Sequence, residues 1–552
     1  MTGKRAFLEL LRQEGVDIIF GNPGTTELPL MDALASEDGI RYVLAMSEAA
    51  VMAMADGYAQ ATGRLTVVNL HVAPGLGNAM GMLYDAQKAA SPILVTAGQH
   101  EQGFNVTEPI LYADLQTLAR PLVKSTAEVH RLEDLPRIIH RAAKTALAPP
   151  TGPVFVSLPG DIFNAETEVD LAAPTRIAPR IRADRAAVES AADMLVRSTS
   201  PVLVAGDAVA QSRAHDEMVA LAELLGAPVY TEGVANTASF PASHPLFRGA
   251  MGRLAPGIRQ ALQQFDLLFS VGGDLYTLSL PANVEPVPDG MPIIHLDLDP
   301  WELGKNHATS IAMMGDPKAT LPEIAEAVRA RLDDGARKRI AARRAAMEQT
   351  IAKEREAIRA KGRADAAKTP IQPLSLLEAI GANLPRDAVV IEEALSSAGG
   401  IRSLINSDDP QSYFGLRGGG IGWGLPAAIG VKIALPDRPV VALIGDGSAM
   451  YTIQALWTAA HTKAGVVFVI LNNASYRILK QRVTALRGFA AQTGRYVAMD
   501  FTDPPVDFVN LARSLGIAAQ RTTTVADTID VLKKAIADGG PTLIDVAIDR
   551  SL

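Results

Sequence analysis

The chain has 552 residues, of which 48% are apolar and 20% are charged, which is ordinary for a folded protein with a large core. At roughly 150 residues per domain this length suggests three or four domains. The formal net charge is −8 and no basic run occurs, which makes nucleic acid a poor candidate partner. Because cysteine is absent, disulfides, cysteine nucleophiles and thiolate metal sites are excluded. No apolar run is long enough to cross a membrane and no signal-like stretch opens the chain, so we expect a cytoplasmic protein.

Short apolar runs alternate along the chain with longer stretches of helical period, a pattern typical of parallel α/β sheets. A first domain is expected over residues 1–165. Its predicted strands are 18–20, 42–45, 65–70, 93–97 and 154–158. Residues 164–184 are polar and contain proline, so we interpret them as a linker.

A second domain is expected over residues 185–333. Its predicted strands are 201–205, 228–231, 267–271 and 293–298. Residues 336–368 are rich in Ala, Arg, Lys and Glu with little apolar face, and we interpret them as a solvated helix that tethers two domains. A third domain is expected over residues 370–552, with strands at 388–391, 440–444, 466–471 and 542–546. The predicted fold class is therefore α/β, with three doubly wound parallel-sheet domains.

The most informative motif follows two neighbouring strands of the third domain. Gly445-Asp446-Gly447-Ser448 follows the first strand, and Asn473 follows the second, 473 − 446 = 27 residues after Asp446. The carboxyl ends of adjacent parallel strands open on one edge of a sheet, where ligands bind. A carboxylate, an amide oxygen and nearby carbonyls suit Mg²⁺ or Ca²⁺, while the glycines and the following helix N-terminus suit a diphosphate. The alternative is an Asp-Gly turn beside an unrelated Asn-Asn loop.

This pattern resembles the signature of thiamine-diphosphate-dependent enzymes, and the likeness covers most of the chain. The segments that are similar to benzoylformate decarboxylases are 20–29, 69–71, 75–81, 120–124, 445–448 and 455–460. Residues 295–300 and 304–306 are more like acetolactate synthases. The resemblance implies that thiamine diphosphate lies between the first domain of one subunit and the third domain of another. It therefore implies at least a homodimer, and a tetramer as in similar enzymes.

Glu48 lies in a stretch of helical spacing, and its neighbours three and four residues away are all apolar. A carboxylate on such a face is desolvated unless it is paired, although it could also escape to solvent. The resemblance implies that Glu48 contacts N1′ of the cofactor aminopyrimidine and promotes the imino tautomer that removes the thiazolium C2 proton. His71 follows the predicted strand 65–70, and a lone histidine there could be structural. The resemblance implies that His71 binds the substrate and moves protons.

The resemblance carries further residues into the cofactor site. The carbonyl of Gly419 would bond the pyrimidine amino group, and Ile421 would support the bent cofactor from below. Asp446, the side chain of Asn473 and the carbonyl of Ser475 would hold Mg²⁺. The residues implied beside the diphosphate are Leu395, Ser396, Gly447, Ser448, Tyr451 and Tyr476. Residues 75–77, Gly-Leu-Gly, are a weak phosphate signal by themselves and are interpreted as a turn.

Two positions depart from the decarboxylase pattern inside the implied site. Thr25 stands where the decarboxylase has a catalytic Ser, so a hydroxyl for the substrate carboxylate is kept, although Thr25 could instead be a turn or cap residue. The stretch 272–281 lacks the second active-site His. Candidate substitutes there are Tyr276, Thr277 and Ser279.

A third departure follows the metal loop, where the decarboxylase is less basic. Three cations lie there, and they are Arg477, Lys480 and Arg482. They could recognise a second anionic group on the substrate, or they could be solvated on a helix face.

We therefore predict a thiamine-diphosphate-dependent carboxy-lyase that converts a 2-oxo acid, most simply an aromatic one such as benzoylformate, to an aldehyde and CO₂. The main alternative is an acetolactate-synthase-like carboligase, with FAD or another nucleotide in the central domain. A dinucleotide-dependent oxidoreductase has weaker support, because the glycines at 206 and 272–273 do not complete a G-x-G-x-x-G motif. A non-catalytic paralogue would explain the missing His but not the presence of Glu48, His71 and Asp446.

Overall fold

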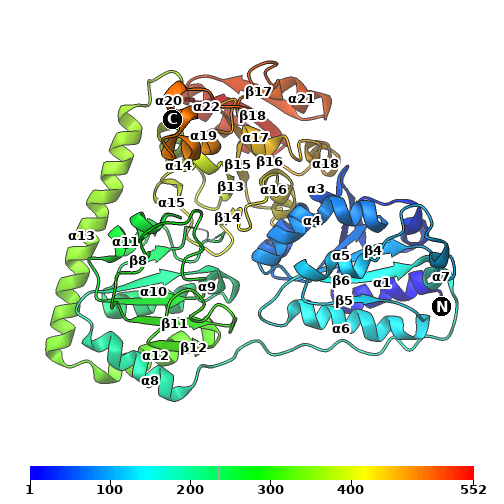
Figure 1. Cartoon of the computed structure of the whole chain (residues 1–552), viewed down its shortest axis with the longest axis horizontal. Coiled ribbons are helices and arrows are strands. Elements are labelled where there is room, and N and C mark those ends of the chain that lie inside the picture. The colour runs from blue at the N-terminus through cyan, green and yellow to red at the C-terminus, as the bar shows by residue number, and fades with distance from the viewer. Residues whose placement is uncertain (234–235) are drawn as a thin grey trace. The chain divides into compact units, whose positions relative to one another are not determined.

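The computed structural model describes residues 1–233 and 236–552 (Figure 1). The chain folds into two compact units. The first unit comprises residues 1–178, 390–397 and 416–552, and the second comprises residues 179–389 and 398–415. The strands form three six-stranded parallel sheets with helices between the strands, so the predicted α/β fold class is confirmed. Among the residues described, none of the helices combines the length and apolarity needed to cross a lipid bilayer.

The first sheet has the strand order β2-β1-β3-β4-β6-β5. Its strands are β1 (Ile18–Gly21), β2 (Arg41–Leu44), β3 (Thr66–Leu70), β4 (Ile93–Gln99), β5 (Thr126–Glu128) and β6 (Val154–Pro159). Strands β1, β3, β4 and β6 are buried along their whole length, as expected for strands covered on both faces. The helices of this part are α1 (Gly3–Gln13), α2 (Leu28–Ser36), α3 (Glu48–Thr62), α4 (Val72–Lys88), α5 (Leu115–Ala119), α6 (Leu135–Leu147) and α7 (Gly160–Asn164), with short 3₁₀ turns η1 (Thr25–Glu27), η2 (Asn105–Thr107), η3 (Arg120–Leu122) and η4 (Leu132–Asp134).

Helix α4 corrects one prediction. Residues 75–77 were expected to form a turn, but they lie in the first half of a helix that begins at Val72. Val72, Leu76 and Ala79 are fully buried at helical spacing. Their packing outweighs the low helix propensity of the two glycines.

The second sheet has the order β12-β11-β10-β7-β8-β9. Its strands are β7 (Pro201–Ala205), β8 (Val229–Thr231), β9 (Phe247–Ala250), β10 (Leu267–Val271), β11 (Ile293–Asp297) and β12 (Ile311–Met314). The helices are α8 (Arg185–Arg197), α9 (Asp207–Gln211), α10 (His215–Leu225), α11 (Ala255–Leu262), α12 (Pro317–Arg331), α13 (Asp334–Ala364), α14 (Pro373–Asn383) and α15 (Ile401–Leu404).

The predicted helix over 336–368 is α13, which has 31 residues and runs along the second unit (Figure 1). It is not merely a solvated tether. Arg343 donates to the carbonyl of Thr199 at 2.9 Å, Arg355 donates to the carbonyl of Phe247 at 2.6 Å, and Ile351 is buried. The arginine stems cover apolar surface while their guanidinium groups reach backbone oxygens, so α13 packs on its unit without a wide apolar stripe.

The third sheet has the order β14-β13-β15-β16-β18-β17. Its strands are β13 (Val389–Glu393), β14 (Tyr413–Gly415), β15 (Val440–Gly445), β16 (Val466–Asn472), β17 (Ala518–Thr522) and β18 (Thr542–Ala547). The remaining elements are η5 (Leu395–Ser397), α16 (Gly424–Ala434), α17 (Asp446–Ala449), α18 (Ala455–Thr462), α19 (Arg477–Ala485), α20 (Phe489–Thr493), α21 (Phe508–Ser514) and α22 (Val525–Asp538).

Inside the first unit, α3 packs closely along α16. A Cβ on Gly57 would lie 2.3 Å from the carbonyl oxygen of Ala427, and a Cβ on Gly430 would lie 1.9 Å from that of Met54. Glycine is therefore required at both positions for the two backbones to approach. The indole of Trp423, beside α16, donates to the buried carboxyl of Asp56 at 2.7 Å.

The limits predicted for three separate domains stay predictions. The three sheets span residues 18–159, 201–314 and 389–547. The expected linker was residues 164–184. Asn164 ends α7, and the residues after it, 165–184, contain no helix or strand and are largely exposed.

Candidate active site

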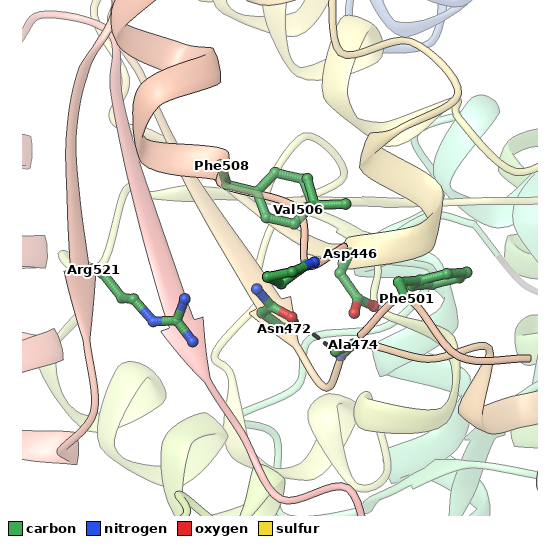
Figure 2. A pocket seen from close by; sticks show the side chains of 8 residues that line it. Asp446, Asn472, Ala474, Phe501, Val506, Phe508 and Arg521 are labelled. Carbon is green, nitrogen blue, oxygen red and sulfur yellow. Dashed lines mark hydrogen bonds between the residues drawn. The ribbon is translucent and has the colours of Figure 1, made fainter. Parts of the chain in front are cut away.

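The predicted metal loop forms at the carboxyl ends of β15 and β16, which pair up to Gly445 and Leu471. Asp446 opens α17 directly after β15 and is 3% exposed, while Asn473 and Ser475 follow β16 and are each 4% exposed. Asp446 lines a small cavity with Asn472, Ala474 and the rings of Phe501 and Phe508. Figure 2 shows its carboxylate directed toward Ala474. The spacing in the sequence therefore placed these groups correctly at one edge of the sheet.

The carboxyl of Asp446 has one oxygen without a partner. Oδ1 accepts from the amide of Gly447 at 3.0 Å, whereas Oδ2 is buried and has no hydrogen-bond partner among the described residues. Burial raises the pKa of Asp446 to about 6, although nearby backbone amides offset part of this effect. A buried carboxylate oxygen without a donor is costly, and a divalent cation would satisfy it.

The other oxygens of the loop are neutral. Oδ1 of Asn473 accepts from both the amide and the hydroxyl of Ser475, at 3.0 and 2.9 Å, which fixes the amide plane. Within residues 1–233 and 236–552 there is no group of three or more His, Asp or Glu side chains arranged to hold a metal. A cation at Asp446 would thus depend on neutral oxygens and on oxygens of a bound ligand, which is the donor set that the sequence predicts.

Glu393, which sequence reasoning missed, organises the glycine loop before α16. It lies at the end of β13, is fully buried, and accepts from the amides of Gly422 (2.6 Å) and Gly424. Burial raises the pKa of Glu393 to about 7. Gly419 and Gly422 have φ of 92° and 101°, a left-handed backbone that favours glycine. The loop that contains the predicted residues Gly419 and Ile421 is therefore shaped by Glu393.

The remaining residues implied beside a diphosphate surround this loop and α17. A hydrogen bond with Ser448 lowers the pKa of Glu393 against the effect of burial. The ring of Tyr476 meets Phe501 edge-on at 4.5 Å, and burial together with a hydrogen bond to Tyr451 raises the pKa of Tyr476. Leu395 is 37% exposed, and Ser396 beside it is half-buried.

Glu48 lies at the edge of the first sheet and begins α3. Its side chain is not solvated, because the residue is only 8% exposed. Its Oε1 accepts from Nδ2 of Asn22 and its Oε2 from Nδ2 of Asn78, both at 3.1 Å. Two neutral amides thus fix the plane of the carboxyl without neutralising it. The two asparagines were missed, because nothing in the sequence relates one loop and one helix position to Glu48.

His71 lies at the same edge, between β3 and α4. A Cβ on Gly75 would be 3.3 Å from both Oε1 of Glu48 and Cβ of His71, so the two predicted catalytic side chains are neighbours. Nδ1 of His71 lies 2.9 Å from Oε2 of Glu27, which sequence reasoning did not single out. Thr25 is exposed, whereas the hydroxyl of Thr26 lies 3.2 Å from Nδ1 of His71.

The cations after the metal loop are not simply solvated. Lys480 pairs with Asp500 at 2.6 Å and its side chain is only 12% exposed. Nε and Nη1 of Arg477 are buried without a hydrogen-bond partner among the described residues. Arg482 is half-buried. The interpretation of this segment as a solvated helix face is therefore wrong for Lys480 and Arg477.

The candidates for the missing second histidine lie in the second unit. Tyr276 is 4% exposed, and its hydroxyl donates to Sδ of Met251 at 3.3 Å. Thr277 is exposed and donates to Asp274 at 3.0 Å, and Ser279 is also exposed. A role for any of them stays a prediction.

The glycines of the weak dinucleotide signal have a packing role. A Cβ on Gly206 would lie 2.0 Å from the carbonyl oxygen of Gly272, so the ends of β7 and β10 require a glycine here. This close approach explains why position 206 is glycine, and no bound nucleotide is needed to account for it.

Models of thiamine pyrophosphate enzymes match three parts of the chain: the N-terminal TPP binding domain at residues 1–115, the central domain at 188–324 and the C-terminal TPP binding domain at 396–546. Benzoylformate decarboxylase of Pseudomonas aeruginosa is 35% identical over 548 residues, which cover 99% of this chain and 98% of the relative. Acetolactate synthase large subunit of Corynebacterium glutamicum is 29% identical over 550 residues, covering 97% of this chain and 84% of the relative.

Two solved structures are similar over the whole length. The 4-hydroxybenzoylformate decarboxylase of Rhodococcus jostii RHA1 has a TM-score of 0.87 at 34% identity, covering 100% of both chains. The benzoylformate decarboxylase of Polynucleobacter necessarius has a TM-score of 0.88 at 29% identity, covering 100% of this chain and 99% of that one.

Proposed function

Because the chain belongs to the thiamine pyrophosphate-dependent enzymes, we propose that it decarboxylates an aromatic 2-oxo acid of the benzoylformate type to an aldehyde and CO₂. The observation that carries this proposal is the proximity of Glu48 and His71 at one sheet edge, in a chain that is similar to benzoylformate decarboxylase over its full length. When bound, thiamine diphosphate supplies a nucleophilic carbon and accepts the electron pair released with CO₂.

The protein positions groups and moves protons. Glu48 would hold a proton at N1′ of the aminopyrimidine, and the amides of Asn22 and Asn78 keep its carboxyl in one plane. His71 would donate to the substrate carboxylate or carbonyl and return a proton to the product carbon. Thr25 would hydrogen-bond the substrate carboxylate from its exposed position as the first residue of η1.

Asp446, Asn473 and the carbonyl of Ser475 would hold Mg²⁺ with the diphosphate. The unpartnered Oδ2 of Asp446 supports this assignment. The carbonyl of Gly419 and the side chain of Ile421 would contact the aminopyrimidine, and the open space around the Cα of Gly419 is compatible with a ligand there. The residues proposed beside the diphosphate are Leu395, Ser396, Gly447, Ser448, Tyr451 and Tyr476.

We further propose a homodimer as the smallest active form, and a tetramer as the complete assembly. Exposed apolar side chains along the first unit are consistent with a covering partner, and they include Leu28, Met46, Val106 and Ile110, which are 59%, 50%, 87% and 83% exposed. The cytoplasmic location stays a prediction.

The second candidate function is carboligation, in which the same activated carbonyl is joined to a second one. The similarity to acetolactate synthase over 97% of the chain favours it. The product separates the two functions, since only the decarboxylase releases a free aldehyde from each substrate molecule.

The test is CO₂ release from benzoylformate, phenylpyruvate, pyruvate and a dicarboxylic 2-oxo acid, with thiamine diphosphate and Mg²⁺ present and products separated by chromatography. We expect the fastest release from benzoylformate, with benzaldehyde as product. Turnover of pyruvate alone, with an acetolactate product, would assign the carboligase instead. Turnover of the diacid alone would indicate that Arg477 binds a second anionic group on the substrate.

A further inference from the structure

Glu27 is a buried carboxylate that the proposed chemistry does not use. It ends η1 and is 1% exposed. Oε1 accepts from the amide of Gly98 at 2.9 Å and from the hydroxyl of Thr26 at 2.7 Å. Oε2 accepts from the amide of Gly24 at 2.9 Å and lies 2.9 Å from Nδ1 of His71. Two backbone amides, one from Gly24 before η1 and one from Gly98 in β4, thus fix the carboxylate in one orientation.

The hydrogen-bond pattern determines which nitrogen of His71 carries the proton. The hydroxyl of Thr26 donates its hydrogen to Glu27, so toward Nδ1 of His71 its oxygen can only accept. Oε2 of Glu27 is also an acceptor. Both neighbours of Nδ1 therefore require a proton on Nδ1, and the neutral ring then has Nε2 free of hydrogen on its opposite side.

The surrounding backbone approaches both side chains closely. A Cβ on Gly24 would lie 2.1 Å from Nδ1 of His71, and a Cβ on Gly98 would lie 2.1 Å from Oε1 of Glu27. Glycine is thus needed at both places where a backbone amide reaches Glu27. The side chain of His71 is still 20% exposed, so Glu27 covers one side of the ring only.

We propose that Glu27 is a positioning residue for His71 in the reaction proposed above. It holds the imidazole with Nδ1 protonated and Nε2 as the atom that meets the substrate. When Nε2 takes up a proton, the carboxylate of Glu27 stabilises the resulting imidazolium, and the proton on Nε2 is the one passed to the product carbon. The inference rests on the proposed function for its kinetic part, but not for the tautomer.

The first experiment needs no substrate. Protein labelled with ¹⁵N-histidine is examined by NMR, and the His71 signals are assigned by their loss in His71→Asn. We expect the neutral wild-type ring in the Nδ1–H form. Glu27→Gln places an amide against Nδ1, and we expect it to shift the ring toward the Nε2–H form. A wild-type ring in the Nε2–H form would overturn the proposal, even if no substrate is found.

The second experiment is the pH profile of kcat/KM. Without the carboxylate the imidazolium is less stable, so Glu27→Gln should move the limb assigned to His71 to lower pH and reduce kcat/KM by on the order of 10²-fold or more. The affinity for thiamine diphosphate should stay unchanged. Glu27→Asp, which keeps the charge, should recover part of the activity and of the wild-type profile.

The matched control is Glu37→Gln, because Glu37 is a surface partner of Arg12 at 3.2 Å in the same part of the chain. It should leave both profile and activity unchanged. If Glu27→Gln does not fold, the wild-type tautomer and Glu27→Asp still decide the question. An unshifted pH limb in a folded Glu27 variant, or a loss explained by weaker cofactor binding, would assign Glu27 a purely structural role.

Discussion

Asp85 is the buried carboxyl whose replacement has the clearest expected effect on stability. It lies in α4 and is 1% exposed. Its Oδ1 accepts from the amide of Gly420 at 3.0 Å, whereas Oδ2 is buried without a partner among the described residues. Burial raises the pKa of Asp85 to about 8, and the charges of Asp56 and Glu393 add to the effect.

The sign of the effect follows from linkage. The pKa rises from 3.8 in the unfolded chain to about 8 in the folded one, so between these values the folded state binds a proton that the unfolded state lacks. Its contribution is therefore most favourable at low pH and is lost as the pH rises toward 8. At 1.36 kcal/mol per pKa unit the lost stability is about 2 kcal/mol at pH 5.5 and about 5 kcal/mol at pH 8.

Asp85→Asn removes the titrating group but keeps an acceptor for the amide of Gly420. We expect the variant to be more stable than the wild type at pH 8, and this advantage should shrink by about 3 kcal/mol between pH 8 and pH 5.5. Urea unfolding followed by tryptophan fluorescence measures it, since Trp423 is fully buried in the same unit.

The control is Asp32→Asn. A hydrogen bond to the Lys4 ammonium and its charge lower the pKa of the exposed Asp32 below 3.8, so this carboxyl is ionised in both the folded and the unfolded chain from pH 5.5 to 8. The effect of Asp32→Asn on stability should therefore stay constant over this range. A variant Asp85→Asn that is less stable than the wild type at pH 8 would refute the reasoning. It would show that the folded protein favours the ionised carboxylate.

Three further predictions concern packing and the metal loop. Gly430→Ala should lower the free energy of unfolding by about 1–3 kcal/mol or more, because its Cβ would lie 1.9 Å from the carbonyl oxygen of Met54. The control is Gly257→Ala, which replaces a helical glycine with open space around it and should be neutral or stabilising. Equal melting curves for the two variants would contradict this prediction. Asp446→Ala should abolish Mg²⁺-dependent binding of thiamine diphosphate in calorimetry, and wild-type affinity would disprove the role of its free oxygen. Dialysis against EDTA should release bound thiamine diphosphate from the wild type, and Mg²⁺ should restore it; retention of the cofactor without metal would count against the site.

The interior of each sheet was predictable and most of the edges were not. Interior strands such as β10 and β16 are buried along nearly all their residues and appear in the sequence as continuous apolar runs. The five strands missed by sequence reasoning are β5, β9, β12, β14 and β17, and each lies at an edge of its sheet. Strand β17 is mostly exposed, so its extended form depends on pairing with β18 rather than on its own composition.

The residues of the candidate site likewise fall into those that the sequence predicts and those that only the folded structure reveals. Asp446, Asn473, Glu48 and His71 follow strands or begin helices, so the sequence places them at sheet edges. Glu27 bonds to Gly98, 71 residues away, and no local pattern indicates that contact. The one available signal for Glu27 was its position three residues after Gly24, the spacing of a capping box. Polar residues whose partners lie far along the chain need the folded structure to be recognised.

The most direct test of the account is benzaldehyde formation from benzoylformate by the wild type and by Glu48→Gln, both saturated with thiamine diphosphate and Mg²⁺. We predict equal amounts of benzaldehyde and CO₂ from the wild type. Glu48→Gln should still bind the cofactor but turn over more slowly, by on the order of 10²–10⁴-fold. A wild-type enzyme that forms no benzaldehyde, or a Glu48→Gln variant that matches the wild-type rate, would contradict the account.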